Sequence, residues 1–309
     1  MKTDCKIVFL GTPDFSVKPL SALVENGYDV IAVVCNPDKP VGRKQILTAP
    51  PVKIFAEKNG ISVYQYKCIR KEGVEDMKAL APDLMITCAF GQILSQEILD
   101  IPRLGVYNVH GSLLPKYRGA SPVQSAILAG EKETGVTIMK TDVGVDTGDM
   151  LLSRSIQIGR ETADELFEKL SVLGAEALLS AMPEICGGSP ALIPQKEEEA
   201  THTAMLKKED AEIDWNGSAE KIDCFIRALC GWPVAFTKYR GEPVKIYYGT
   251  PTEGKGKPGE ILSVNKEGVT VACHSGALRV EKLQFPGGKV LSASEVKSGG
   301  KILSGSFFG

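Results

Sequence analysis

The sequence predicts an α/β domain built on a mostly parallel sheet, followed by a small five-stranded β-barrel. The chain has 309 residues, which is more than one compact core of ordinary size accommodates. The first half alternates short apolar runs with helical patterns, which is typical of a parallel sheet covered by helices. The last third contains short strand-like runs separated by turn residues, as in small barrels.

The strands of the first half are predicted from continuous apolar runs. Ile7–Leu10 and Leu84–Ile86 have no polar interruption, as expected for strands that helices bury on both faces. An apolar pair of runs at 136–139 and 150–152, joined by a Gly/Asp-rich turn, predicts a hairpin that extends the sheet. The complete prediction is strands at 6–10, 30–34, 84–87 and 106–110, and helices at 16–25, 52–58 and 74–80.

The second half begins with a long helix predicted at 163–185, which the Gly-Gly-Ser-Pro sequence at 187–190 ends. A polar connecting stretch at 195–203 leads to an amphipathic helix at 219–229, in which apolar residues recur every three or four positions. The barrel strands are then predicted at 233–239, 244–248, 259–264, 268–272 and 277–284. We therefore expect a first domain at 1–189, a linker at 190–206 and a second domain at 207–309.

Composition excludes several classes of protein. Apolar residues make up 43% of the chain and charged residues 24%, a profile of globular proteins and not of disordered chains or coiled coils. We find no run of about 20 apolar residues and no signal segment, so we expect a cytoplasmic protein. Eight irregularly spaced cysteines and three histidines do not form a zinc pattern, and we expect reduced core thiols and no metal.

Charge is unevenly distributed along the chain. The net charge is −2, but from Lys238 onward there are eleven Lys or Arg residues and six Glu residues, which gives this part +5. A basic surface on a small barrel is compatible with a nucleic-acid partner, although a solvated lysine face has the same composition.

The turn after the first strand, Gly11-Thr12-Pro13-Asp14, opens a helix whose backbone N–H groups could face an anion. It has one glycine followed by a proline, where the dinucleotide-binding pattern G-x-G-x-x-G has three glycines. The turn therefore argues against NAD binding and is read as an ordinary helix start.

Three polar side chains are candidates for catalysis. Asn108 and His110 are two residues apart on a predicted strand, so both leave the same face, roughly 6.6 Å apart. Asp142 and Asp146 lie in the Gly-rich turn of the predicted hairpin. The alternative is structural: a buried hydrogen-bonded histidine, an asparagine that forms a turn, and two exposed turn-forming aspartates.

An Asn, a His and an Asp together suit acyl transfer to an amine without a Ser or Cys nucleophile. The amide donates hydrogen bonds without exchanging a proton, so it can stabilise an oxyanion. The imidazole can assist the oxyanion and return a proton to a leaving nitrogen. The carboxylate can orient the imidazole and accept, directly or through water, the proton that the attacking amine releases.

These residues lie in a pattern, Asn-x-His-Gly-Ser-Leu-Leu-Pro followed by Gly-Val-Thr…Asp-x-Gly, that resembles the folate-dependent formyltransferases. The resemblance implies a Rossmann-like first domain and 10-formyltetrahydrofolate as the formyl donor. It implies that the catalytic residues are Asn108, His110 and Asp146. It also implies that two segments bind the folate, the first with backbone groups around the pterin; the residues are Phe90, Gly91, Ile93, Leu94, Ser112, Leu113, Leu114 and Pro115.

The acceptor is suggested by segments outside this centre. The stretch 36–53 resembles the basic insertion loop of those family members that formylate methionyl-initiator tRNA for translation initiation. Three segments near the second domain also resemble those members: 213–215, 226–228 and Trp232-Pro233. The resemblance implies tRNA contacts at Lys39, Arg43 and Lys44, and an OB-like second domain that binds tRNA. Many relatives have a longer basic cluster where this chain has Lys44 and then Gln45. We expect a monomer without membrane association.

Other interpretations remain open from the sequence. Formyltransferases that act on glycinamide ribonucleotide resemble the first domain alone, whereas an enzyme acting on an amino-sugar nucleotide would share the centre and the two-domain length. A nicotinamide oxidoreductase and a non-catalytic RNA-binding module are the alternatives from other classes. The stretch 36–53 could also be a plain solvated connection.

Overall fold

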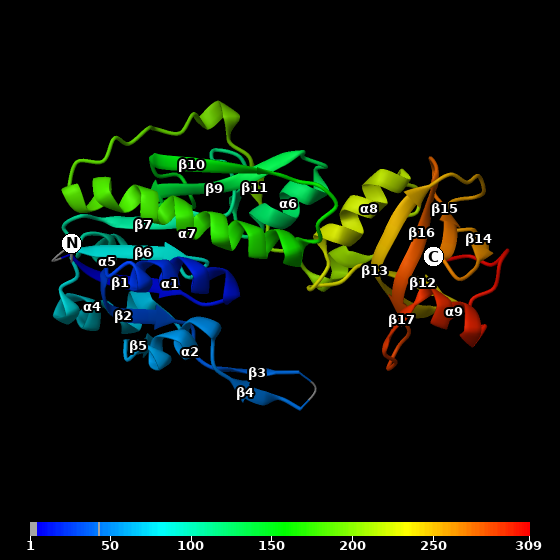
Figure 1. The fold of residues 1–309 in the computed structure, drawn as a ribbon, viewed down its shortest axis with the longest axis horizontal. Coiled ribbons are helices and arrows are strands. Elements are labelled where there is room, and N and C mark those ends of the chain that lie inside the picture. Colours follow the sequence, from blue (N-terminus) through cyan, green and yellow to red (C-terminus); the bar gives the residue numbers. More distant parts are fainter. Residues whose placement is uncertain (1–4, 43) are drawn as a thin grey trace. The chain divides into compact units, whose positions relative to one another are not determined.

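The structure of the chain, a computed structural model, describes residues 5–42 and 44–309, which divide into two compact units (Figure 1). Unit 1 contains the residues up to Pro122 together with Glu133–Gln157 and Phe167–Ala204. Unit 2 contains Val123–Lys132, Ile158–Leu166 and Met205–Gly309. Each unit is therefore assembled from separate stretches of sequence.

Unit 1 is organised around a seven-stranded sheet in the order β10-β9-β7-β6-β1-β2-β5. The five strands from β7 to β5 are parallel, and β9 and β10 form the antiparallel hairpin that the sequence predicts. The predicted mostly parallel sheet is thus confirmed. The strands are β1 (Lys6–Gly11), β2 (Asp29–Cys35), β5 (Ser62–Gln65), β6 (Leu84–Cys88), β7 (Val106–His110), β9 (Glu133–Lys140) and β10 (Met150–Gln157).

Helices alternate with these strands along the chain. The three predicted helices are present as α1 (Val17–Glu25), α2 (Pro51–Lys58) and α4 (Val74–Leu80). The first begins one residue later than expected because Asp14–Ser16 forms a separate 3-10 turn, closed by a hydrogen bond from Ser16 N–H to the Pro13 carbonyl. Three further helices are short: α3 (Ile69–Glu72), α5 (Gln96–Leu99) and α6 (Pro122–Leu128).

The long predicted helix is α7 (Ala163–Gly187). By length and composition it is the one helix among the described residues that could cross a membrane, but half of its apolar stretch is buried inside the protein. Its Gly174 lies so close to the sheet that a Cβ there would be 2.9 Å from Val109 of β7. Ser171 also donates a hydrogen bond of 2.8 Å to the Phe15 carbonyl. These contacts are those of a core helix that covers the sheet.

The stretch between β2 and α2 contains a hairpin that the sequence analysis did not predict. Strand β3 (Lys39–Val41) pairs antiparallel with β4 (Ile46–Thr48). The apolar side chains of Val41, Ile46 and Leu47 are more than half exposed. A two-stranded hairpin that is exposed to solvent has no core of its own. Its sequence therefore lacks the runs of apolar residues that indicate buried strands, and it resembles a polar connection.

Unit 2 has an antiparallel sheet with the path β12-β13-β16-β15-β14, from which β17 pairs with β16. All five predicted strands are present, and the sheet forms a half-barrel whose path ends at β12 and β14. A sixth strand and a terminal helix were not predicted. The elements are α8 (Ala219–Ala228), β12 (Phe236–Tyr239), β13 (Glu242–Thr252), β14 (Ile261–Val264), β15 (Val269–Ala272), β16 (Ala277–Gln284), β17 (Val290–Ser292) and α9 (Ala293–Gly299).

An ion-pair network holds the stretch 158–166 in unit 2. Arg227 and Asp223 of α8 are both buried and paired at 2.9 Å, and Arg160 reaches the other oxygen of Asp223 at 3.0 Å. Arg227 also donates a hydrogen bond of 2.9 Å to the Glu161 carbonyl. Separating the stretch 158–166 from α8 would leave buried charges without their partners, which is costly. The ion pairs therefore hold this stretch against α8. They also give the Ile226-Arg227-Ala228 motif a structural role.

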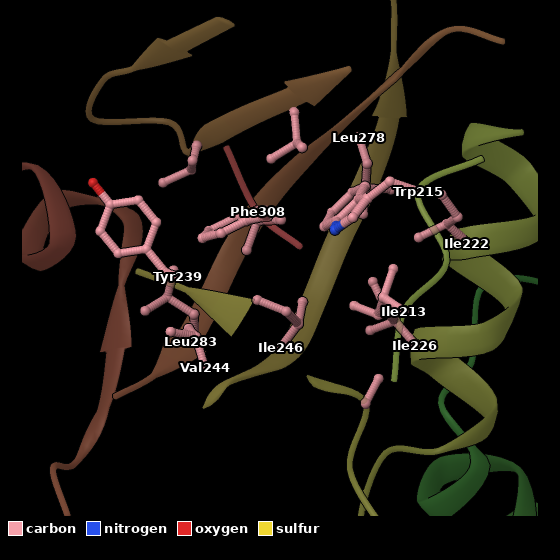
Figure 2. Close-up of a cluster of buried hydrophobic side chains, with 14 of the residues drawn as sticks. Ile213, Trp215, Ile222, Ile226, Tyr239, Val244, Ile246, Leu278, Leu283 and Phe308 are labelled. Carbon is pink, nitrogen blue, oxygen red and sulfur yellow. The ribbon is translucent and has the colours of Figure 1, made fainter. Parts of the chain in front are cut away.

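The core of unit 2 is aromatic at its centre (Figure 2). The Trp215 and Phe308 rings are stacked with centroids 5.9 Å apart, and Tyr239 meets Phe308 edge-on at 5.7 Å. The indole N–H of Trp215 donates a 3.0 Å hydrogen bond to the buried hydroxyl of Thr237. The helix α8 contributes Ile222 and Ile226 to the same cluster.

The two tryptophans allow a stability prediction with an internal control. We expect Trp215→Phe to lower the free energy of unfolding by about 1–3 kcal/mol, because a buried hydrogen bond and ring packing are lost together. Trp232 is half exposed, so Trp232→Phe should change the free energy of unfolding by less than about 0.5 kcal/mol. Urea unfolding followed by circular dichroism measures both, and equal midpoints for the two variants would contradict the prediction.

Candidate active site

The residues of the candidate site are brought together by β6, β7 and the β9–β10 connection. Strand β7 carries Asn108 and His110 and lies parallel to β6, so the segments that follow both strands leave the same edge of the sheet. The connection at 141–149 begins beside the first residue of β7, where Thr141 N–H binds the Val106 carbonyl. Its Asp146 nevertheless reaches both Asn108 and His110. The three predicted catalytic residues thus converge.

The amide of Asn108 is oriented by its two neighbours. Its oxygen lies 3.0 Å from the hydroxyl of Thr87 on β6, and its nitrogen lies 3.4 Å from a carboxylate oxygen of Asp146. An ionised carboxylate only accepts hydrogen bonds, so the NH₂ group is the end that must face it. Asn108 is half-buried, and its NH₂ group faces the Asp146 carboxylate.

The imidazole of His110 is buried and has an acceptor at each nitrogen. Nε2 lies 3.0 Å from the Tyr117 carbonyl oxygen, and Nδ1 lies 3.6 Å from a carboxylate oxygen of Asp146. The ring nitrogen that carries a proton decides which of these two acceptors receives a hydrogen bond. A purely structural histidine would need only the Tyr117 contact.

Asp146 is held at both its backbone and its side chain. Its φ of +54° lies in the left-handed region, which is uncommon for a residue with a side chain. One carboxylate oxygen accepts a 2.8 Å hydrogen bond from Gly119 N–H, and the backbone carbonyl accepts one of 2.9 Å from the Gln195 amide. Asp142 is exposed and instead caps its own turn through Gly144 N–H. Only one of the two aspartates therefore joins the site.

Gly119 and Gln195 both contact Asp146, and the sequence analysis did not single them out. Gly119 has a φ of +107°, and a Cβ at this position would lie 2.5 Å from the Thr203 carbonyl oxygen, so no other residue fits. In the sequence, a glycine directly after an arginine is only a weak indication that the position requires glycine. Gln195 lies in the connecting stretch, where the sequence offers no pattern to single it out.

The predicted folate-binding residues occupy two segments at the same edge of the sheet. Residues 89–94 follow β6 and residues 112–115 follow β7. The side chains of Phe90 and Leu94 are buried in the unit 1 core, so only their backbone groups could touch a ligand. Ser112 is fully buried and donates a 2.6 Å hydrogen bond to the Lys116 carbonyl. Gly91 and Ile93 are exposed, Leu114 is buried, and Leu113 and Pro115 are intermediate.

The turn after β1 supports the first of these segments. The Thr12 hydroxyl lies 3.5 Å from the Phe90 carbonyl, and Asn36 donates to the same carbonyl at 3.3 Å. A Cβ on Gly11 would lie 2.7 Å from that of Ser16, so this glycine permits the close packing of strand and helix. The turn therefore has an internal structural use, which agrees with its interpretation as an ordinary helix start.

The base of the β3–β4 hairpin is fixed by a polar network. Lys53 binds both carboxylate oxygens of Asp38 at 3.0 Å, and Gln65 donates to Asp38 at 2.8 Å. The Gln65 and Lys53 contacts lower the pKa of Asp38. Gln92 donates a 2.8 Å hydrogen bond to Asn36, which connects the hairpin base with the segment 89–94. Lys39 and Lys44 are exposed, and Arg43 lies outside the described residues.

Two buried thiols lie at the ends of strands that lead toward the site, Cys88 at the end of β6 and Cys35 at the end of β2. Burial raises the pKa of Cys88, at the end of β6, to about 12 and that of Cys35 to about 11. Such thiols are protonated and unreactive at neutral pH. In residues 5–42 and 44–309 all eight cysteines are free, and no group of three or more His, Cys, Asp or Glu side chains could hold a metal ion.

Comparison with known sequences gives two family matches and close curated relatives. The Formyl transferase family matches residues 5–182, and the family described as Formyl transferase, C-terminal domain, matches residues 205–301. The methionyl-tRNA formyltransferase of Geobacter metallireducens is 46% identical over 303 residues, which are 97% of this chain and 97% of the relative. That of Alkaliphilus metalliredigens is 46% identical over 308 residues and 98% of each chain.

Solved structures share the fold at lower identity. HypX from Aquifex aeolicus in complex with tetrahydrofolic acid has a TM-score of 0.68 at 21% identity, over 94% of this chain and 46% of HypX. An N-formyltransferase from Helicobacter canadensis, in complex with folinic acid and dTDP-3-aminofucose, has a TM-score of 0.67 at 19% identity, over 91% and 98% of the chains. Methionyl-tRNA formyltransferase from Clostridium thermocellum has 0.57 at 23%, over 81% and 95%. This chain therefore spans about half the length of HypX.

Proposed function

This chain belongs to the formyl transferase family, and on that premise we propose that it transfers the formyl group of 10-formyltetrahydrofolate to the α-amino group of methionyl-initiator tRNA for translation initiation. The curated relatives that support this acceptor match both units of the chain. The observation that carries the chemistry is the convergence of Asn108, His110 and Asp146.

The transfer is direct and needs no covalent enzyme intermediate. The neutral amine attacks the formyl carbon, and the carbonyl electrons move to oxygen to give a tetrahedral oxyanion. Asn108 and His110 donate hydrogen bonds to that oxyanion. Asp146 keeps the imidazole aligned and receives, directly or through water, the proton that the amine loses. When the carbonyl re-forms, the bond to the folate nitrogen breaks and this nitrogen leaves with a proton from His110. The proton that Asp146 received then passes to the imidazole and restores both groups.

The folate binds at the edge of the sheet where β6 and β7 end. Backbone groups of Phe90, Gly91 and Leu94 hold the pterin, and the exposed Ile93 provides an apolar contact. The segment from Ser112 to Pro115, which follows His110 in the chain, lines the same site. The folate complexes of the two structural neighbours named above support a folate donor for this fold.

The tRNA binds through the β3–β4 hairpin and the basic C-terminal part. Lys39, Arg43 and Lys44 contact the acceptor end, and at the base of the hairpin Asn36 accepts a hydrogen bond from Gln92 of the segment 89–94. The domain at 207–309 provides the tRNA-binding surface, the domain at 1–189 carries catalysis, and the stretch at 190–206 links them. The protein acts as a cytoplasmic monomer without membrane association.

The deciding experiment is transfer of a radiolabelled formyl group to charged initiator tRNA. Charged elongator tRNA and a dTDP-linked amino sugar serve as alternative acceptors, because the Helicobacter canadensis neighbour was solved with such a sugar. We expect product with initiator methionyl-tRNA only. Transfer to the amino sugar in preference to tRNA would refute the proposed acceptor.

The hairpin provides a further prediction about tRNA binding. We expect Arg43→Ala to raise the apparent KM for methionyl-tRNA and to reduce the salt dependence by about one unit of slope per lost phosphate contact. Lys58→Ala on the exposed end of α2 is the control and should change neither quantity. Steady-state kinetics at several salt concentrations measure both. If the Arg43 variant matches the parent in KM and in salt slope, the stretch 36–53 is a plain connection.

A further inference from the structure

The stretch that follows α7 is bound along the loop of Asp146. Ile193 and Met150 exchange backbone hydrogen bonds of 2.9 and 2.8 Å, and two residues later Gln195 reaches into the 141–149 loop. The Gln195 amide nitrogen lies 2.9 Å from the Asp146 carbonyl oxygen and 2.7 Å from that of Gly148. One side chain thus holds two carbonyls of the loop that presents the candidate catalytic carboxylate.

The orientation of the Gln195 amide is fixed by a buried arginine. Arg118 is 1% exposed, and its Nε donates a 3.0 Å hydrogen bond to the Gln195 side-chain oxygen. A guanidinium has donors only, so the amide must present its oxygen to Arg118 and its NH₂ group to the loop. Glu197 pairs with the other side of Arg118 at 2.8 Å, which balances the buried charge. The Gln195 side chain is thereby fixed with its oxygen toward Arg118 and its nitrogen toward the Asp146 and Gly148 carbonyls.

A second contact from the same stretch controls the Asp146 side chain. Strand β11 (His202–Thr203) pairs with β8 (Arg118–Gly119), and Gly119 donates its N–H to the Asp146 carboxylate. The connecting stretch therefore acts on both ends of Asp146, through Gln195 at the backbone and through Gly119 at the carboxylate. Because the φ of Asp146 is in the left-handed region, the loop needs such contacts to keep this conformation.

We propose that Gln195 is a positioning residue of the formyl transfer, which holds the Asp146 carboxylate in place beside Asn108 and His110; this inference rests on the proposed function of Asp146. Gln195 then gives the stretch after α7 a role in positioning the site as well as in connecting the units. Gln195 does not touch the reacting atoms. Its loss should lower the rate of the chemical step and leave substrate binding unchanged, because displacements of about 1 Å can cost about 100-fold in rate.

Two substitutions at Gln195 separate its roles. Gln195→Leu keeps the approximate volume but removes every polar contact, whereas Gln195→Glu keeps an acceptor for Arg118 and loses both N–H donors to the loop. We expect each variant to lower kcat by about 10- to 100-fold with KM for both substrates within about twofold. Glu198→Gln, on the exposed side of the same stretch, is the matched control and should keep the parent kcat. Thermal unfolding of each variant checks that it is folded.

A double-mutant cycle with Asp146→Asn tests whether Gln195 acts through Asp146. If it does, Gln195→Leu lowers kcat in the parent as expected above. In the Asp146→Asn background the same substitution changes kcat by less than about twofold. Independent effects that multiply would overturn the inference, as would an unchanged kcat in Gln195→Leu or a loss confined to KM for tRNA. Failure of the parent chain to transfer formyl groups would instead refute the proposed function itself.

Discussion

Asn108→Ala is expected to lower kcat by about 10²- to 10³-fold and to leave the affinity for the folate donor unchanged. The amide NH₂ points toward Asp146 because the Thr87 hydroxyl occupies the amide oxygen at 3.0 Å. In the proposed transfer, a donor held in this way stabilises the oxyanion without reorganising during the reaction. Its removal therefore costs more in the transition state than in the ground state, and kcat changes while substrate binding does not.

Two related variants sharpen this test. Asn108→Asp retains the acceptor for Thr87 but loses the donor and places a second carboxylate beside Asp146, so we expect at least the loss seen with alanine. Thr87→Val leaves the amide in place without its anchor and should cost less. Single-turnover formyl transfer and folate binding by fluorescence measure the two quantities. Unchanged turnover in Asn108→Ala would remove this residue from the mechanism.

Regular local patterns explain why most of the fold could be predicted from the sequence. Buried parallel strands such as β1 and β6 are continuous apolar runs, and α8 repeats apolar residues at helical spacing. Strand β5 was missed because its four residues, Ser-Val-Tyr-Gln, are only partly buried at the edge of the sheet. Strand β17 has three residues and pairs only with β16, so it too has no pattern of its own.

The division into two units depends on contacts that are distant in sequence. The stretch 158–166 follows β10 directly, and its sequence gives no reason to separate it from the first half of the chain. Arg160 joins unit 2 because it pairs with Asp223, 63 residues later. The predicted boundaries follow composition along the chain, whereas such a pair forms only when the chain folds back.

The candidate site shows the same limit. Asn108 and His110 share a strand, so their common face follows from local geometry. The choice of Asp146 over Asp142 comes from the family pattern. In the structure Asp142 caps its own turn, whereas Asp146 accepts a hydrogen bond from Gly119. Gln195 is 49 residues from the loop that it holds. Its two donors could be recognised only when the carbonyls that they bind were placed.

Asp146→Asn is the variant that separates charge from shape at the site. Asparagine keeps an oxygen that can accept from Gly119 N–H, so the loop should retain its position. It removes the negative charge beside His110 Nδ1, 3.6 Å away in the parent. In the proposed transfer this carboxylate is the group that receives the amine proton. General acid–base groups contribute about 10²- to 10⁴-fold, and we expect kcat to fall by this amount with little change in KM.

Asp142→Asn is the matched control in the same loop. Its side-chain oxygen accepts from Gly144 N–H and from the Thr147 hydroxyl, and an asparagine oxygen can accept from both. We expect parent activity in this variant because the charge of Asp142 faces solvent and not the imidazole. Equal kcat values for the two variants would show that the loop carboxylates only shape the turn, and that another group accepts the proton.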